Sequence, residues 1–450
     1  MRECTSLEYV RTVSVPVHYL TTRKKLSYLD RLTARLTYAV RLFCERISNK
    51  GRIPKSRGDI RKHSPWVREK TGLSAGFIQQ AEDKALWMWK SYKEQHRRWK
   101  WMLSKAKKGT KWYQKLLKRG PSPPCTSRRS KLKKIPIRFD KRTGQVQRAD
   151  LVLTNWVIHI STLKKHETID ILLNPSESHE KLLEEGQIKD FEIVRKNSWY
   201  YIHITCVFEV QTQPIKKFVG VDLGIRRSAS TVSTNPANGR PYDFHIFKDG
   251  KRERISELND RISHLRRLEK WEALKRLRHK RLNVSEDYDW KLAKTIAESC
   301  TNSYVFLGNP EYIRYHNYRG NGDRTGRKLL QNWSFDRQIQ YTQNQCAKRG
   351  VQSRALNEWG TSCRCHKCGA NVERFKGSRI ICTKCGLQDD AERNSSINIV
   401  QRGISHLDDK SLASHKAPNR AGAPDERARI TDDSALKPPT SVEATHFNEW

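Results

Sequence analysis

Two Cys-x-x-Cys motifs in the last third of the chain form the most specific chemical pattern in the sequence. They are Cys365–Cys368 and Cys382–Cys385, and each is followed directly by a glycine. A Cys-x-x-Cys turn directs two thiolates toward one ion, and two such turns complete a tetrahedral site with four sulfur ligands. We therefore predict a closed, structural zinc site formed by Cys365, Cys368, Cys382 and Cys385.

The cysteines are distributed unevenly along the chain. Five of the eleven lie between Cys363 and Cys385. Such clustering favours a metal site in a reducing compartment over a framework of disulfide bonds. Cys363 and His366 lie within the same segment and are alternative ligands, although the spacing favours the two Cys-x-x-Cys pairs.

A single carboxylate interrupts an apolar run in the middle of the chain. Residues 218–225 read Phe-Val-Gly-Val-Asp-Leu-Gly-Ile, which predicts a buried strand with Asp222 near its carboxyl end. A charge in apolar surroundings is costly unless it binds something. Divalent cations that prefer oxygen ligands are natural partners for such a group. The alternative is that Asp222 caps a turn at the end of the strand.

Further acidic residues follow at two places downstream. Glu358 comes just after the strand expected over 351–356, and Asp390 and Glu392 precede a helical pattern. Each also has a simpler explanation. Glu358 could be a surface carboxylate before a turn, and Asp390 and Glu392 could stabilise the N-terminus of a helix.

The charge balance of the chain indicates a polyanionic partner. The 450 residues include 88 Lys and Arg against 48 Asp and Glu, a formal net charge of +40. This excess is far larger than solubility requires and favours nucleic acid over a membrane surface. No run of 18 apolar residues occurs, and the N-terminus lacks the apolar core of a signal peptide. We expect a cytoplasmic protein of a prokaryote or its mobile element, without membrane binding.

The hydrophobic pattern predicts two kinds of structure in the first half of the chain. A strand over 9–17 is followed by helices over 24–49 and 74–118, the second of them interrupted near Gly109. Several short strands between 135 and 210 are separated by turn residues and predict a small β-barrel. The strand over 9–17 could belong to this barrel, with the helices inserted between its strands.

The second half alternates between strands and helices. A strand pair is expected to continue through 226–250, followed by helices over 251–282 and 287–303. The apolar segment over 304–307 predicts a buried strand, and a further strand is expected over 351–356.

The helical region over 74–118 mixes cations with aromatic side chains. Cations contact phosphates, and exposed rings stack on bases. For a single tryptophan, helix packing is the better explanation, but the basic surface as a whole favours contact with nucleic acid. The candidate nucleic-acid-binding residues are Arg97, Arg98, Trp99, Lys100, Lys105, Lys107 and Lys108.

The order of these motifs resembles a known family. The segment around Asp222 is similar to the first acidic motif of RuvC-like nuclease domains, which have the RNase H fold, in TnpB proteins and compact type V CRISPR effectors. The family commonly places a Glu at the end of the strand over 304–307, where this chain has Gly308. A TnpB subgroup and the Fanzor proteins that resemble it carry a substitute Glu on the neighbouring strand, and Glu358 fits that position. Glu392 matches the third acid, with Asp390 as the alternative.

The resemblance implies an α/β multidomain fold. It contains a RuvC-like nuclease domain with a Cys4 zinc ribbon, a β-barrel wedge domain and an inserted helical recognition domain. The implied boundaries are 1–22 for the first wedge strand, 23–130 for the recognition domain, 131–214 for the wedge barrel, 215–360 for the nuclease domain, 361–388 for the ribbon, 389–405 for the third nuclease motif and 406–450 for a disordered tail.

The resemblance also implies an activity. Asp222, Glu358 and Glu392 would hold two Mg²⁺ ions for RNA-guided cutting of double-stranded DNA, after recognition of a short flanking motif. A transposon-end RNA and a CRISPR RNA are equally open as the guide, and a homodimer is open as an assembly. Two alternatives are a nuclease-deficient RNA-guided DNA-binding protein or repressor, and a guide-free nuclease or transposition accessory protein.

Overall fold

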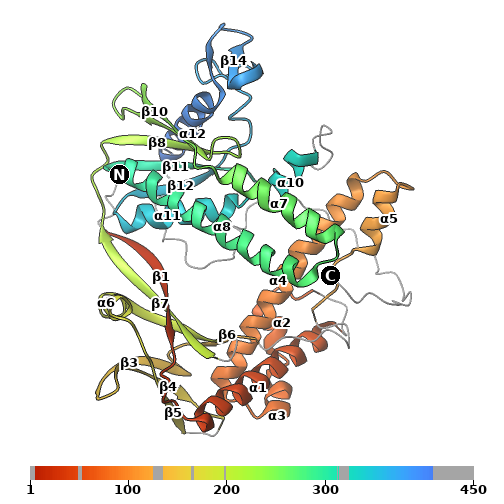
Figure 1. Cartoon of the computed structure of the whole chain (residues 1–450), viewed down its shortest axis with the longest axis vertical. Coiled ribbons are helices and arrows are strands. Elements are labelled where there is room, and N and C mark those ends of the chain that lie inside the picture. Colours follow the sequence, from red (N-terminus) through yellow and green to blue (C-terminus); the bar gives the residue numbers. More distant parts are fainter. Residues whose placement is uncertain are drawn as a thin grey trace.

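The computed structural model of the chain describes residues 6–48, 53–124, 135–163, 167–196, 199–311, 313 and 324–408. Figure 1 shows the N-terminal helices and their sheets toward one end, and a second sheet with the cysteine-rich segment toward the other. The predicted mixed α/β architecture is confirmed. The predicted tail over 406–450 lies outside the described residues from 409 onward.

Two antiparallel sheets stand where the sequence predicted a barrel. The first has the order β1 (Ser6–Pro16), β7 (Trp199–Gln211), β6 (Gln187–Lys196), β2 (Ile137–Phe139). The second consists of β3 (Gly144–Leu151), β4 (Thr154–Ser161) and β5 (Thr168–Leu172). Among the described residues one isolated bridge, between Val17 and Leu173, links strand ends of the two sheets. The strand prediction is therefore confirmed, but these residues pair as two sheets and not as one closed sheet.

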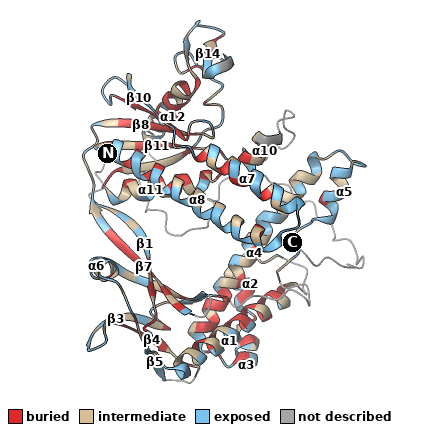
Figure 2. Ribbon diagram, in the orientation of Figure 1, coloured by how far each residue is buried: buried red, intermediate tan, exposed pale blue. Residues whose placement is uncertain are grey.

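The predicted helices are inserted between β1 and β2, as α1 (Arg23–Ser48), α4 (Ala75–Lys105) and α5 (Lys111–Lys118). Two short helices between them, α2 (Arg57–Arg61) and α3 (Ser64–Thr71), were not predicted. Apolar residues at three- and four-residue spacing bury one face of α1 against α4. The buried residues of α4 end at Trp89, so its basic second half carries no buried side chain. Figure 2 shows this half and α5 as largely exposed or intermediate.

The second half of the chain contains a mixed five-stranded sheet. Its order is β10 (Pro241–Phe247), β9 (Ala229–Thr234), β8 (Lys217–Leu223), β11 (Ser303–Asn309), β12 (Gln352–Asn357). The last three strands run parallel to one another, whereas β9 and β10 pair antiparallel. Parallel strands bring their carboxyl ends to the same edge of a sheet, so residues at the ends of β8, β11 and β12 lie close together.

Helices cover both faces of this sheet. Alternate residues of β8, including Val219 and Val221, pack with α8 (Trp271–Ser299) and α11 (Phe335–Lys348). Phe218 lies on the opposite face and packs with α12 (Ala391–Asp408). Period-2 alternation therefore places Asp222 on the face that α12 covers.

One helix boundary was predicted wrongly. The sequence pattern suggested helices over 251–282 and 287–303, but the chain forms α7 (Lys251–Arg267) and then α8 without a break at 283–286. The turn lies at 268–270, where Glu269 has a positive φ of 53°. No Gly or Pro marks this turn, which is why the pattern did not reveal it. Helix α6 (Glu177–Glu185) was also missed within the strand-rich region.

The cysteine-rich segment forms a small sheet of its own. Strands β13 (Val372–Arg374), β14 (Arg379–Cys382) and β15 (Gln388–Asp390) pair antiparallel, and β15 leads directly into α12. The short helix α10 (Arg324–Asn332) precedes α11. In the described ranges, no helix has the length and apolar character needed to cross a membrane.

Candidate active site and metal centre

Asp222 is placed by the close packing of α12 on β8. A Cβ on Gly220 would lie 2.2 Å from the backbone oxygen of Ser396, so only a glycine allows the helix this near to the strand. The close approach brings the first turns of α12 over the end of β8. There the Ser395 side chain hydrogen-bonds to the half-buried Asp222 carboxylate.

Glu358 reaches the same place from the neighbouring strand. Its backbone N–H donates to the carbonyl of Asn309 at 3.2 Å, and its own carbonyl accepts from the Thr361 hydroxyl at 2.8 Å. A Cβ on Gly308 would lie 2.6 Å from Glu358 Oε2. The Glu358 carboxyl group thus fills the space beside Gly308, at the strand end where related nuclease domains are expected to carry their own Glu.

The two carboxyl groups repel each other and are partly withdrawn from solvent. Burial, followed by the negative charge of Glu392, raises the pKa of Asp222 to about 7. Burial and the charge of Asp222 raise the pKa of Glu358 to about 8. Glu358 Oε2 is buried and has no hydrogen-bond partner among the described residues. This unpaired acceptor beside a second carboxylate fits a divalent cation with oxygen ligands.

The third acid is shared with an arginine. Arg227 Nη1 lies 2.9 Å from both Asp390 carboxyl oxygens and 3.2 Å from Glu392 Oε2. Asp390 Oδ1 also accepts the Glu392 backbone N–H at 3.0 Å, so Asp390 caps the start of α12. Glu392 also has a partner on each oxygen, because Arg227 contacts Oε2 and the Ser378 hydroxyl donates to Oε1 at 3.1 Å. Of the two acids, Glu392 is the one whose negative charge raises the pKa of Asp222.

The three acids are neighbours, but they do not form a closed cluster. In the part of the chain that the structure describes, only the four cysteines bring three or more such ligand atoms within 4.8 Å of one another. The negative charge of Glu392 raises the pKa of Asp222, and the negative charge of Asp222 raises the pKa of Glu358. The order is thus Glu358, Asp222, Glu392, with Asp222 as the shared member. Binding of two ions by this set stays a prediction.

The four predicted cysteines do converge. The Sγ atoms are 3.7 Å apart for Cys365 and Cys385, and 3.4 Å apart for Cys368 and Cys382. Tetrahedral zinc with Zn–S bonds of about 2.3 Å requires sulfur separations of about 3.8 Å, so the site fits zinc. Hydrogen bonds from the backbone N–H groups of Cys385 and Lys384 lower the pKa of Cys382 to about 6, which favours the thiolate that zinc requires.

Neither alternative ligand belongs to this cluster. Cys363 is exposed and lies outside the group of four sulfur atoms. The His366 backbone N–H donates to Asn394 Oδ1 at 2.9 Å, and its ring Nδ1 lies 3.1 Å from the same oxygen. His366 therefore joins the ribbon to α12 and does not face the metal site.

Two asparagines of α12 hold the segment that carries Glu358. Asn394 donates to the carbonyl of Arg364 at 2.8 Å, and Asn398 donates to the carbonyls of Thr361 and Arg364 at 2.8 and 2.7 Å. Asn394 is fully buried. The ribbon, the Glu358 loop and α12 are thereby joined into one unit.

Sequence reasoning missed the cations around the site. The positive charge of Arg374, from the ribbon, lowers the pKa of Asp222, and that of Arg402, from α12, lowers the pKa of Glu358, although burial outweighs both. Arg227 pairs with the third acid. In a chain with 88 cationic residues, none of these three could be singled out by spacing alone.

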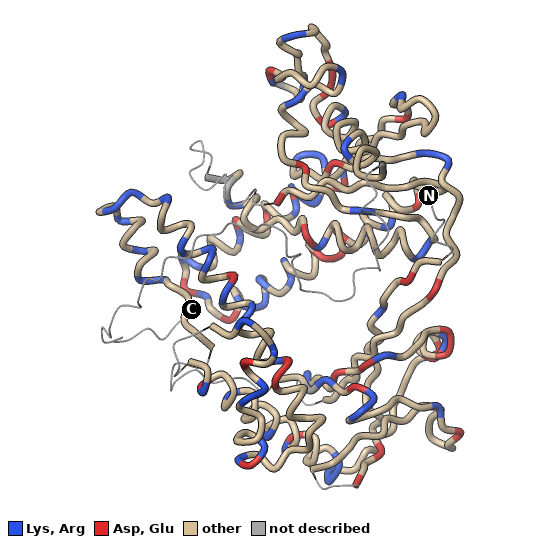
Figure 3. Tube along the Cα trace, turned by 180° about the vertical axis from the view of Figure 1, so that it is seen from behind, with Lys and Arg blue, Asp and Glu red and all other residues tan. Residues whose placement is uncertain are grey.

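The predicted nucleic-acid-binding residues lie on α4 and the turn before α5. Arg97, Lys100, Lys105, Lys107 and Lys108 are exposed, and Lys and Arg recur along these helices in Figure 3. Arg98 is half-buried. Trp99 differs, because its indole N–H donates to the Leu116 carbonyl at 2.8 Å and its ring packs against Gly120. This geometry favours a packing role for Trp99.

Comparison with known proteins points to one family over part of the chain. Residues 335–399 match the family model of the Cas12f1-like TNB domain. This segment runs from α11 through β12 and the ribbon into α12, and it includes Glu358, the four cysteines and Glu392. The resemblance to compact type V effectors is confirmed for this segment. No curated protein matches the chain.

Solved structures of type V effectors are similar at low identity. A Cas12f1–sgRNA–target DNA complex has 14% identity and a TM-score of 0.34, covering 88% of this chain and 99% of that one. CRISPR-Cas_phi3, a mini-RNA-guided endonuclease, has 10% identity and a TM-score of 0.41, with 88% and 93% covered. C2c1 of Alicyclobacillus acidoterrestris with single-guide RNA has 10% identity and a TM-score of 0.41, with 86% and 68% covered. At these scores the likeness does not extend to individual residues.

The cysteine cluster predicts a selective loss of zinc. Cys385→Ser should reduce the zinc content from about one ion per chain to almost none, because a structural site needs all four ligands. Cys363→Ser is the matched control and should retain the ion. Inductively coupled plasma mass spectrometry of the purified proteins measures both. Loss of zinc from the Cys363 variant would contradict the assignment of ligands.

The raised pKa values predict how stability changes with pH. A carboxyl group with a raised folded-state pKa favours folding while protonated, and this advantage is lost as pH rises from the usual value near 4 through about 7 to 8. Without divalent metal, Glu358→Gln should match the parent near pH 5 and exceed its unfolding free energy by roughly 1–3 kcal/mol at pH 8.5. Denaturant titration measures this difference, and Mg²⁺ should restore the parent. Equal stability at both pH values would contradict the account.

The contact at Gly308 predicts a loss of metal affinity. In Gly308→Ala the new Cβ would meet Glu358 Oε2 at 2.6 Å and Ile399 Cδ1 at 2.8 Å, so the carboxyl group must move. We expect Mn²⁺ affinity, measured by calorimetry, to fall by roughly tenfold or more. Gly58→Ala is the control, because its Cβ meets nothing closer than 3.5 Å. Unchanged Mn²⁺ affinity would show that the position of Glu358 beside Gly308 is irrelevant to metal binding.

Proposed function

We propose that the protein is an RNA-guided DNA endonuclease with a RuvC-like active site, similar to TnpB proteins and compact type V CRISPR effectors. The observation that carries the proposal is the Glu358 carboxyl group, which fills the space beside Gly308 next to Asp222. A buried carboxylate oxygen without a partner, such as Glu358 Oε2, destabilises the fold, so its presence at the position of the missing acid favours a function for it. The family match over residues 335–399 and the net charge of +40 support the same proposal.

The mixed sheet supports a RuvC-like domain that gathers its acids from distant segments. Asp222 comes from β8, Glu358 follows β12, and Glu392 opens α12. When bound to these carboxylates, Mg²⁺ would supply charge for activating water and for stabilising the leaving oxygen in phosphodiester hydrolysis. Adjacent strands are about 5 Å apart, so a Glu on either can serve one site.

The residues of this chain would orient and charge that site. The backbone contacts of Glu358 with Asn309 and Thr361 fix its carboxyl group. Arg402 favours the ionised form of Glu358, and Arg374 does the same for Asp222. Each carboxylate must be ionised to bind a cation, so these two arginines would help to charge the site near neutral pH.

Guide RNA and target DNA are the proposed polyanionic partners. The exposed cations of α4 and of the turn before α5 offer contacts to phosphates that do not depend on sequence. The two antiparallel sheets would form the wedge part, and α1–α5 the recognition part. Base pairing with the guide would then select the target, after the protein has recognised a short flanking motif.

A second candidate function is guided DNA binding without cutting. The observation that favours it is the pairing of Arg227 with both Asp390 and Glu392, which neutralises the third acid. If Arg227 stayed in place, Glu392 would contribute little charge to a bound cation. Cutting activity distinguishes the two candidates.

The test uses protein purified together with its RNA and a plasmid carrying the matching target. The parent should cut in the presence of Mg²⁺, and Asp222→Ala and Glu358→Ala should each cut about 100- to 1,000-fold more slowly. Glu311→Ala is the control, because Glu311 is an exposed acid near the end of the same strand as Gly308.

Three outcomes have different meanings. Full cutting by Glu358→Ala would overturn the assignment of the second acid, and loss of cutting with Glu311→Ala alone would transfer the role to Glu311. Guided binding by the parent without any cutting would establish the second candidate function.

A further inference from the structure

An exposed tryptophan follows the proposed catalytic acid directly. The Trp359 side chain is 72% exposed, although its backbone is held on both sides. Its N–H donates to Asn357 Oδ1 at 2.8 Å, and its carbonyl accepts from Arg402 Nη2 at 3.1 Å. A large ring presented to solvent from a fixed backbone favours a binding role, because exposure leaves much apolar area unburied.

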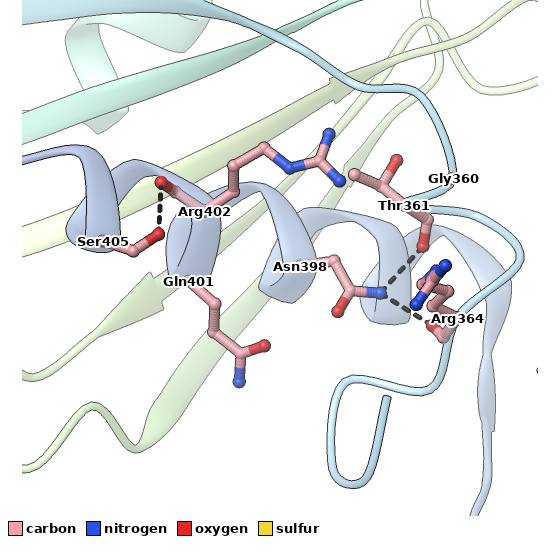
Figure 4. A pocket seen from close by; sticks show the side chains of 7 residues that line it. All are labelled: Gly360, Thr361, Arg364, Asn398, Gln401, Arg402 and Ser405. Carbon is pink, nitrogen blue, oxygen red and sulfur yellow. Dashed lines mark hydrogen bonds between the residues drawn. The ribbon is translucent and has the colours of Figure 1, made fainter. Parts of the chain in front are cut away.

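A positively charged pocket lies next to this tryptophan. It has a volume of about 310 Å³ and lies between the loop 360–364 and the second half of α12. Figure 4 shows Arg402 and Asn398 of α12 extending toward the loop that carries Thr361 and Arg364. Two guanidinium groups and no carboxylate line the pocket, so its chemistry suits an anion.

The two arginines of this pocket form no ion pair with an acidic side chain among the described residues. Arg364 is exposed, and its guanidinium forms no ion pair with an acidic side chain in the described ranges. Arg402 donates to the carbonyls of Asn357 and Trp359, which are uncharged, so its charge is retained. These two carbonyls belong to the residues directly before and after Glu358. The pocket is therefore adjacent to the proposed catalytic acid.

We propose that Trp359 and the pocket of Arg364 and Arg402 bind single-stranded nucleic acid beside Glu358. One unpaired base would stack on the Trp359 ring, and a neighbouring phosphate would enter the pocket. This inference rests on the proposed function for its position next to a cutting site, but the binding itself does not require cutting.

Single strands fit this arrangement better than duplexes. Inside a duplex both faces of each base are already covered by neighbouring bases, so an exposed ring finds a free face only on an unpaired nucleotide. Guanidinium groups contact phosphates of any sequence. Trp359, Arg364 and Arg402, together called the clamp, would thus accept either DNA or RNA, provided that the strand is unpaired. They would position that strand against Glu358.

Photocrosslinking identifies the residue that contacts the base. Full-length Asp222→Asn protein would be irradiated with 5-iodouracil oligonucleotides that are single-stranded DNA, single-stranded RNA or duplex DNA of one sequence, and adducts would be mapped by mass spectrometry. We expect an adduct on Trp359 with at least one of the single strands and about fivefold less with the duplex. Adducts elsewhere without one on Trp359 would overturn the proposal. So would a Trp359 ring that is protected from solvent before oligonucleotide is added, because another part of the chain or a second copy would then cover it.

Binding measurements separate stacking from charge. Trp359→Ala should weaken single-strand binding by about tenfold, and Trp359→Phe should stay within about twofold of the parent, because a phenyl ring still stacks. Trp290→Ala is the control, since that tryptophan is 47% exposed on α8. Arg364→Gln should make the slope of the logarithm of the binding constant against the logarithm of salt concentration shallower by about one, because one phosphate contact is lost. Arg261→Gln, on α7, should leave this slope unchanged.

Failure of this inference differs from failure of the proposed function. In a protein that cuts, Trp359→Ala should raise KM for single-stranded substrate by about tenfold and change kcat by less than about threefold. A protein that never cuts would still show the Trp359 adduct and the weaker binding. An equal effect of Trp359→Ala and Trp290→Ala on single-strand binding would overturn the clamp, whether or not the protein cuts.

Discussion

The site depends on two acidic side chains, Asp222 and Glu358, that are held close together and partly withdrawn from solvent. Asp222 and Glu358 come from separate segments, and each raises the free energy of ionising the site. A buried carboxylate without a partner lowers the stability of the fold, so this arrangement favours a function for the two acids. Close packing creates the space, since Gly220 admits α12 and Gly308 admits the Glu358 side chain. A cation that binds both acids would remove the repulsion.

The cysteine-rich segment with β13–β15 contributes to the same arrangement from outside. The two Cys-x-x-Cys turns precede α12, and the side chains of Asn394 and Asn398 bind carbonyls of the segment between Glu358 and the ribbon. Because His366 also contacts Asn394, a change in the conformation of the ribbon would disturb the hydrogen bonds that hold the loop after Glu358. The ribbon is therefore a support of the acid site in addition to any contact that it makes with nucleic acid. Its Arg374 extends this role, because its charge acts on Asp222.

Local patterns in the sequence revealed the parts of the site, but not the contacts among them. The strand carrying Asp222, the cluster of four cysteines and the long inserted helices follow from periodicity and spacing, which are short-range properties. The role of Gly308 could not be derived in this way, because it is defined by a side chain from another strand. Arg227 was missed for the same reason, since its partners lie more than 160 positions away in the sequence. The turn at Glu269 has no Gly or Pro, and strand pairing into two sheets in place of a barrel depends on long-range contacts.

The most direct measurement of the central claim is the anomalous diffraction of Mn²⁺ in crystals of the protein. The account predicts an anomalous peak bonded to carboxylate oxygens of both Asp222 and Glu358, with the Glu358 side chain still beside Gly308. An ion bound only by other acids, with Glu358 turned away from Asp222 or paired with a protein cation, would contradict it.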